Sequence, residues 1–167
     1  MRDGKLFNGD LLNRKRAVTP GSMIKPISYA EILECPDLLT EYAAECSIPE
    51  IGPINPQREM YAALENAGIM KAFAAFNAEK LIGFATVLTT VIPHYGQKIA
   101  TLESLFVSKK FRNSGAGGKL MDAVESYAKE AACVGILYSA PAAGQLERLL
   151  AASKKYKRTN AVFYRSL

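Results

Sequence analysis

Cysteine and histidine are scarce in this chain of 167 residues, which contains three cysteines and one histidine. The cysteines Cys35, Cys46 and Cys133 are odd in number and widely spaced, so they do not support a disulfide framework. A zinc site needs a set of Cys and His ligands at short spacings, and His94 is the only histidine. The sequence therefore predicts three reduced, packed thiols and no metal site.

Long hydrophobic runs are also missing. The longest mainly apolar run, residues 81–92 ("LIGFATVLTTVI"), contains three threonines and is well short of the roughly 20 apolar residues of a membrane-spanning helix. Residues 1–22 are polar and basic and lack the apolar core of a signal peptide. These absences predict a cytoplasmic protein with no membrane partner.

The composition is that of a globular protein, with 49% hydrophobic and 22% charged residues. The length suits one domain, predicted over residues 23–167, after an N-terminal arm at 1–22 that is a flexible arm, an added strand or upstream sequence. The net charge of +5 suits ligands that carry phosphate, or nucleic acid, but a solvated basic surface has the same composition.

Hydrophobic periodicity predicts a mixed α/β fold with a largely antiparallel sheet flanked by helices. Strands are predicted over residues 23–32, 69–76, 81–92, 99–107, 133–140 and 160–167. Helices are predicted over 36–46, 57–68, 120–131 and 143–153, and the proline-rich segment 47–57 is predicted to be an irregular surface loop. No internal repeat interrupts this order.

Three glycines, Gly115, Gly117 and Gly118, crowd the start of the helix that follows the strand 99–107. Glycine permits positive φ and lets a ligand approach the backbone, and a helix start offers unpaired N–H groups to an anion. The stretch is not a Walker A loop, because Asn113 replaces its first glycine and Leu120 its hydroxyl residue. It also fails as a dinucleotide fingerprint, because Leu120 replaces the third glycine.

The motif that remains is R-x-x-G-x-G, from Arg112 to Gly117, and it resembles the acetyl-CoA signature of the GNAT family, the Gcn5-related N-acetyltransferases. The segment "LESLFVSKKFRNSGAGGKLMDAVESYAK" is similar to the central motif of that family, and the order of elements from Met23 to Leu167 also matches. The resemblance implies the GNAT (acyl-CoA N-acyltransferase) fold, an N-acetyltransferase activity, and acetyl-CoA as cosubstrate without a metal. It further implies a set of cofactor-binding residues, in which strand residues run along pantetheine and loop N–H groups hold the pyrophosphate: Leu105, Phe106, Val107, Arg112, Asn113, Ser114, Gly115, Ala116, Gly117, Gly118 and Lys119.

Acetyl transfer to an amine needs a base, because an alkyl ammonium with a pKa of about 10.4 is protonated at neutral pH. Glu103, an ionisable residue inside an otherwise apolar strand, is the candidate general base, directly or through water, and partial burial would make it a stronger base. The oxyanion is expected to bind a backbone N–H at Val107 or a neighbour. Many family members supply a tyrosine as proton donor after the fifth strand, but "LLAASKKYKRT" has alanine there. The alternatives are Tyr95, Tyr138, water, or departure of the thiolate without a proton donor.

The acceptor is predicted to be a primary amine, and the sequence does not distinguish a small amine from a protein or a modified nucleic acid. His94 and Tyr95, in the turn "VIPHYGQK", are candidate substrate residues because this turn borders the substrate mouth in the expected architecture. Further candidates lie around the proline-rich segment: Tyr42, Glu45 and Glu50.

Two other interpretations and one question of assembly stay open. A non-catalytic acyl-CoA-binding sensor or interaction module of the same fold would also explain the glycine motif. Nucleic-acid binding is not favoured, because only Tyr156 is interleaved with the basic residues. A homodimer is a candidate assembly, since the fold often dimerises.

Overall fold

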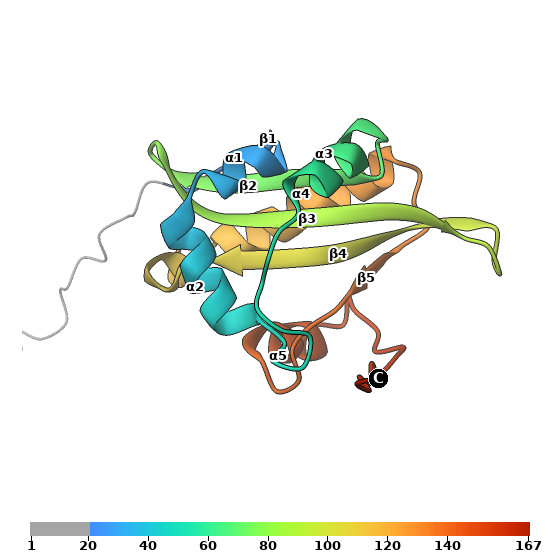
Figure 1. Cartoon of the computed structure of the whole chain (residues 1–167). Coiled ribbons are helices and arrows are strands. Elements are labelled where there is room, and N and C mark those ends of the chain that lie inside the picture. Colours follow the sequence, from blue (N-terminus) through green and yellow to red (C-terminus); the bar gives the residue numbers. More distant parts are fainter. Residues whose placement is uncertain (1–20) are drawn as a thin grey trace, which may run out of the picture.

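The computed structural model describes residues 21–167, which fold into a five-stranded sheet with helices on both faces (Figure 1). Apart from Gly21 and Ser22, the N-terminal arm predicted at 1–22 lies outside the described residues. In chain order the elements are β1 (Met23–Ile27), α1 (Tyr29–Leu33), α2 (Pro36–Cys46), α3 (Arg58–Asn66), β2 (Met70–Asn77), β3 (Lys80–Ile92), β4 (Gln97–Val107), the 3₁₀ helix η1 (Lys109–Ser114), α4 (Ala116–Glu130), β5 (Ile136–Tyr138) and α5 (Gln145–Ala152).

The strands follow one another across the sheet in the order β1-β2-β3-β4-β5. The first four are antiparallel neighbours, and β5 pairs parallel to β4. A parallel pair requires a crossover connection, which α4 supplies here. The predicted mixed α/β fold with a largely antiparallel, helix-flanked sheet is confirmed.

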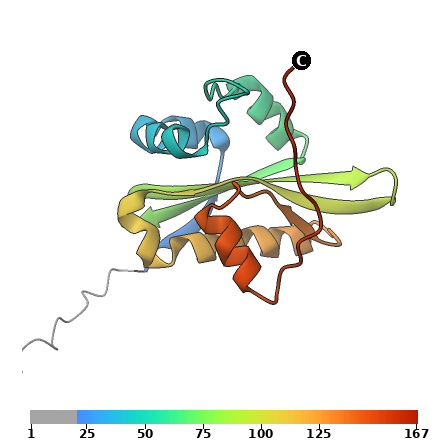
Figure 2. The same ribbon diagram turned by 90° about the horizontal axis from the view of Figure 1, so that it is seen from below.

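Helices lie on both faces of the sheet (Figure 2), and the core forms two layers, one on each face. On one face, α4 packs Leu120 and Val124 against Ile82 and Leu102 of the strands. On the other face, α1, α2 and α3 cover a second cluster, whose largest buried members are Tyr29, Ile32, Phe84 and Phe106. Each strand of the centre therefore has apolar side chains on both faces, as the near-continuous apolar runs in the sequence require.

The first predicted strand is too long, because its second half is helix α1. Ser28 caps this helix: its Oγ accepts the Glu31 N–H at 3.3 Å, and the Glu31 carboxylate accepts the Ser28 N–H at 2.8 Å. This reciprocal capping box satisfies helix-start donors that a continued strand would leave unpaired. The strand prediction over residues 23–32 was therefore wrong beyond Ile27.

The predicted C-terminal strand at 160–167 is also wrong, since this segment forms no strand pairing within the described chain. It runs past the edge of the sheet toward the side of α1 to α3 (Figure 2), where the Tyr164 hydroxyl donates to the Glu50 carbonyl at 3.0 Å. Val162 and Phe163 are 87% and 91% exposed. A β-forming composition needs a strand edge to pair with, and β5, with three residues, offers a very short one.

Two further sequence predictions concern the thiols and the membrane. Cys35, Cys46 and Cys133 are free thiols, each partly buried. Across residues 21–167, no helix has both the length and the apolar character needed to cross a bilayer.

Candidate active site

The candidate site is centred on a β-bulge in β4. Thr86 of β3 lies opposite Ser104, and the next residue, Val87, lies opposite Leu102, so Glu103 is the extra residue on β4. Leu102 belongs to the apolar layer under α4, whereas Thr86 is one of the alternate β3 positions that face α1 to α3. A bulge of this kind can direct consecutive side chains to one face of a sheet. Here Glu103 and Ser104 both reach Thr86 on the α1–α3 face.

The Glu103 carboxylate is held by two hydroxyl donors. The Thr86 hydroxyl donates to one carboxylate oxygen, and the Tyr61 hydroxyl lies 3.4 Å from the other. Thr86 is fully buried and its Oγ1 is also 2.6 Å from the Ser104 Oγ, so the polar groups under the bulge satisfy one another. Glu103 itself is exposed, so the partial burial expected from its apolar strand is not observed.

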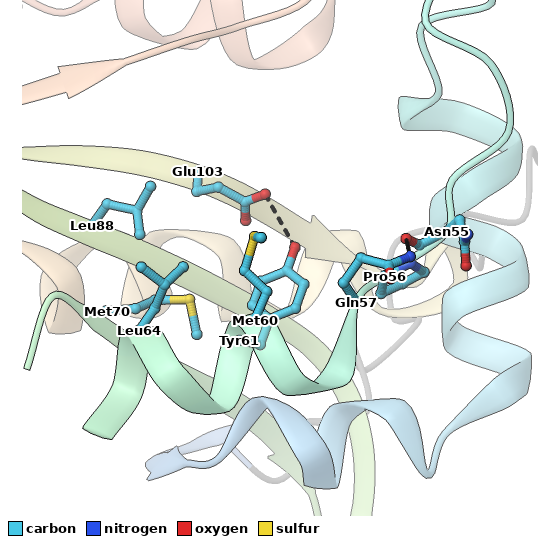
Figure 3. Close-up of a pocket in the computed structure, with 9 residues that line it drawn as sticks. All are labelled: Asn55, Pro56, Gln57, Met60, Tyr61, Leu64, Met70, Leu88 and Glu103. Carbon is cyan, nitrogen blue, oxygen red and sulfur yellow. Dashed lines mark hydrogen bonds between the residues drawn. The ribbon is translucent and has the colours of Figure 1, made fainter. Parts of the chain in front are cut away.

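A cavity of about 280 Å³ lies between α3 and the sheet, and Glu103 forms part of its wall (Figure 3). Four of its nine lining residues are leucine or methionine: Met60, Leu64, Met70 and Leu88. Asn55, Pro56 and Gln57, at the end of the proline-rich loop, close the side away from Leu64, Met70 and Leu88 (Figure 3). The cavity wall thus carries one carboxylate among side chains that are otherwise apolar or neutral.

Tyr61 is supported by Tyr29, whose ring stacks on it with centroids 3.5 Å apart and planes 9° apart. Burial raises the pKa of Tyr61, and the nearby Glu103 carboxylate raises it further, so the Tyr61 hydroxyl stays protonated and donates at neutral pH. Sequence reasoning missed Tyr61, Tyr29 and Thr86 as site residues. Tyr61 was visible only as part of the apolar face of a helix, and no spacing connects it to a carboxylate on a distant strand.

After the bulge, the edge of β4 that faces β5 is no longer paired with that strand. β4 pairs with β5 only at Ala100, Thr101 and Leu102, and within the described residues the stretch from Glu103 to Val107 has no strand on that side. Backbone N–H and C=O groups along such an edge can pair with an extended ligand. Glu103 is the first residue of this free edge.

The glycine motif stands at the far end of the same strand. Gly115 has φ +80°, a left-handed conformation that favours glycine, and it caps the N-terminus of α4. Within residues 21–167, the N–H groups of Gly117 and Gly118 have no protein acceptor. A Cβ at Gly118 would meet no atom within 4 Å, and one at Gly117 would only touch Val107 at 3.9 Å. Open space over unpaired N–H groups at a helix start fits a phosphate.

Arg112 fixes this loop to the protein with its side chain. Its Nε donates to the Val107 carbonyl at 3.0 Å, a guanidinium nitrogen is 2.5 Å from Glu45, and the group lies over the Phe106 ring at 5.5 Å. Burial opposes ionisation of Glu45, but hydrogen bonds from Arg112 and Lys109 outweigh it and lower the pKa of this carboxyl. Because the Arg112 side chain is engaged, this residue offers a ligand its backbone N–H.

Three of the remaining sequence candidates, Tyr138, His94 and Tyr95, lie away from Glu103. Tyr138 donates to Glu125 of α4 at 3.0 Å on the opposite face of the sheet, and burial together with that carboxylate raises its pKa well above the ordinary value. His94 and Tyr95 pack edge to face in the β3–β4 turn, beyond Gln97, which is about 20 Å along β4 from Glu103 at ~3.3 Å per residue. The structure brings neither tyrosine to the cavity.

Several solved structures have the same fold as this chain. An aminoglycoside acetyltransferase from an uncultured soil metagenomic sample is 17% identical, with a TM-score of 0.69 over 88% of this chain and 97% of that one. A ribosomal-protein-alanine N-acetyltransferase from Brucella melitensis is 18% identical, with a TM-score of 0.67 over 89% and 99%. A GNAT family acetyltransferase from Staphylococcus aureus is 13% identical, with a TM-score of 0.64 over 89% and 100%.

At these identities the structural neighbours establish the fold alone, and no curated protein shows significant sequence similarity to the chain. The sequence pattern of the family described as "Acetyltransferase (GNAT) family" matches residues 36–149, which is more than half of the chain. This span includes α2, the cavity, the bulge and the glycine loop. The chain therefore belongs to the GNAT acetyltransferase family, whose members transfer acyl groups from acetyl-CoA.

Proposed function

We propose that this protein transfers the acetyl group of acetyl-CoA to a primary amine bound in the cavity beside Glu103, by direct attack of the amine on the thioester. The single observation that carries the proposal is the position of the bulge. The side chain displaced by it, Glu103, is both a wall of the cavity and the first residue of the free β4 edge. An acceptor in the cavity and an extended thioester ligand on that edge would meet at this carboxylate.

The residues present fit the cosubstrate. The unpaired N–H groups of Gly117 and Gly118 would hold the pyrophosphate, and Lys119 adds positive charge at the same helix start. The Ala116 N–H donates to the Ser114 Oγ at 3.3 Å, so the backbone from Arg112 to Ala116 shapes the loop around these two donors. The backbone of Leu105 to Val107 would pair with the pantetheine arm. Bound there, the thioester supplies an activated acetyl group with a thiolate leaving group.

Glu103 is the group that removes a proton from the acceptor ammonium. A primary ammonium must lose a proton before its nitrogen can form the new C–N bond, and a carboxylate oxygen of Glu103 accepts it, directly or through water. Addition of the neutral amine to the thioester carbon would form the C–N bond and an oxyanion. The C–S bond would then break with its electron pair on sulfur, and the second proton lost by the nitrogen would pass to the thiolate, directly or through water. Tyr61 and Thr86 keep the carboxylate directed at the cavity by donating to its two oxygens. A backbone N–H near Val107 is the candidate oxyanion donor.

The test is thiol release from acetyl-CoA with a panel of amines: n-hexylamine, spermidine, an aminoglycoside and a short peptide with N-terminal alanine. Glu103→Gln should lower kcat at least roughly a hundredfold, the usual contribution of a general base, with acetyl-CoA binding unchanged. Glu79→Gln, in the β2–β3 turn, is the matched control and should retain full activity. Tight acetyl-CoA binding without turnover on any amine would favour a non-catalytic acyl-CoA-binding module instead.

A further inference from the structure

The charges that line the cavity are unusually few for a site that receives a cation. Of the residues in its wall, Glu103 is the only carboxylate, and none is lysine or arginine. The rest of the wall is Leu, Met, Pro, Tyr and two neutral amides. We propose that the acceptor is a monoamine, with one ammonium group on an apolar chain or ring and no second charge. This inference rests on the proposed acetyltransferase function and specifies its substrate class.

Within residues 21–167, several carboxylates on the helices that cover this face of the sheet are already engaged, so they are poorly placed to receive a second ammonium on the acceptor. Glu65 accepts the Tyr29 N–H at 2.9 Å, Glu45 binds Arg112 and Lys109, and Glu41 accepts Ser108 and the Lys109 N–H. Glu34 is paired with Arg58. On α3, Glu59 precedes Met60 and lies on the side of the helix turned away from the Met60–Leu64 face, because helical neighbours are about 100° apart. Polyamines and other polycations are therefore poor acceptors.

A negative charge on the acceptor would be equally isolated. Among residues 21–167, Arg58 follows Gln57 of the wall but is paired with Glu34, and Lys109 and Arg112 of the loop after β4 are paired with Glu45. An amino acid or another zwitterion would have to place its carboxylate against Leu64, Met70 or Leu88 without a partner. The wall thus selects against both signs of charge at the end remote from Glu103.

The size of the chamber agrees with a small apolar body. A dry cavity of about 150 Å³ can hold benzene, and ligand pockets for drug-sized molecules run to roughly 300–1,000 Å³. At about 280 Å³, this cavity has room for a ring or a short alkyl chain beside the ammonium group. Each methylene that it buries should raise affinity roughly fourfold.

Three probes of equal chain length separate the possibilities: n-hexylamine, 1,6-diaminohexane and 6-aminohexanoate. They present the same primary amine to Glu103 and differ only in the charge at the other end. With the full chain and saturating acetyl-CoA, n-hexylamine should have a kcat/KM at least roughly thirtyfold above either charged probe. A wild-type protein that uses the diamine or the amino acid as well as n-hexylamine would overturn the inference.

Met60→Glu tests the cause of the preference. Met60 lines the cavity but is 63% exposed, so a carboxylate there is compatible with folding. The variant should improve 1,6-diaminohexane relative to n-hexylamine at least roughly tenfold and should not improve 6-aminohexanoate. Ala62→Glu places the same charge on an exposed position of α3 outside the cavity wall and should leave both ratios unchanged. Equal effects of the two variants would also overturn the inference.

Calorimetric titration of the three probes into the protein saturated with CoA separates this inference from the proposed function. Absence of turnover on every amine would defeat the acetyltransferase proposal, and the binding ratios alone would then decide the substrate class. Preferential binding of n-hexylamine by at least about tenfold supports the monoamine site, and equal or reversed binding refutes it.

Discussion

The glycines of the loop before α4 are predicted to respond to alanine with opposite signs. Gly115 has φ +80°, where an L-residue costs about 1–2 kcal/mol, so Gly115→Ala should lower the free energy of unfolding by about that amount. Gly118 lies in the right-handed first turn of α4, with open space where a Cβ would lie. Gly118→Ala should therefore raise the free energy of unfolding by up to about 0.5–1 kcal/mol. For a protein of this size, the melting temperature would fall by roughly 2–8 °C in the first variant and rise by up to roughly 4 °C in the second.

Urea unfolding and thermal melts of the two variants measure these differences, and Gly115→Asn is the matched control. Asparagine tolerates the left-handed region, so its cost should lie between those of glycine and alanine. Because relief of the strain introduced by the alanine side chain would move the loop, Gly115→Ala should also raise the KM for acetyl-CoA several-fold. A Gly115→Ala protein as stable as the wild type, or Asn and Ala variants of equal stability, would refute the left-handed cap and the loop geometry built on it.

Three further predictions concern the side chains around the site. Thr86→Val should lower kcat about tenfold with the KM for acetyl-CoA unchanged, which steady-state kinetics measure. It should also lower the free energy of unfolding by about 1–3 kcal/mol in urea, because the buried Ser104 hydroxyl loses its partner. Tyr61→Phe should lower kcat several-fold with little loss of stability, whereas Tyr138→Phe should lower stability and spare kcat, and the reverse result would return Tyr138 to the mechanism. Glu125→Gln should lower the free energy of unfolding by about 1 kcal/mol at pH 7. Burial opposes ionisation of Glu125, but hydrogen bonds from Lys155, Tyr138 and Tyr156 outweigh burial and lower the pKa of this carboxyl. Because the pKa of Glu125 is lower in the folded protein, its ionised carboxylate stabilises the fold at pH values above the unfolded pKa near 4.5. This stabilisation is lost as the pH falls through the folded-state pKa, so the melting temperatures of wild type and variant should converge in acid.

Local patterns were sufficient to predict most of the elements. The helix predicted over 36–46 is α2 with the same bounds, because Pro36 fixes its start and its apolar positions recur at helical spacing. The β2–β3 hairpin follows from two β-rich runs around a polar turn. The Ser28-Tyr29-Ala30-Glu31 capping box was also legible in the sequence, so the error over α1 was avoidable. The C-terminal segment was not predictable in this way, since strand formation depends on a partner edge.

The candidate site was predictable only where it depends on backbone conformation or on one strand. Gly115 and Glu103 could be selected from the sequence, but the contact between Tyr61 and Glu103 exists only once α3 packs over β4. Tyr95 and Tyr138 were plausible by residue type, yet one lies at the end of a long hairpin and the other faces α4. Distances between elements far apart in sequence depend on packing, which residue type and spacing do not encode.

The bulge at Glu103 explains how a charged residue can stand inside a strand whose other residues build the core. In a regular strand, residues two apart share a face, but Leu102 and Leu105 both face the α4 layer although they are three apart. The extra residue at the bulge shifts the alternation of faces by one position. Leu105 and Val107 therefore still face the core, while Glu103 faces the cavity. Deleting Glu103 would restore regular pairing with β3 and at the same time remove the only carboxylate of the cavity wall. A sheet shaped by stability alone has no need of that irregularity, and its coincidence with the start of the free β4 edge supports the proposal that Glu103 acts in catalysis.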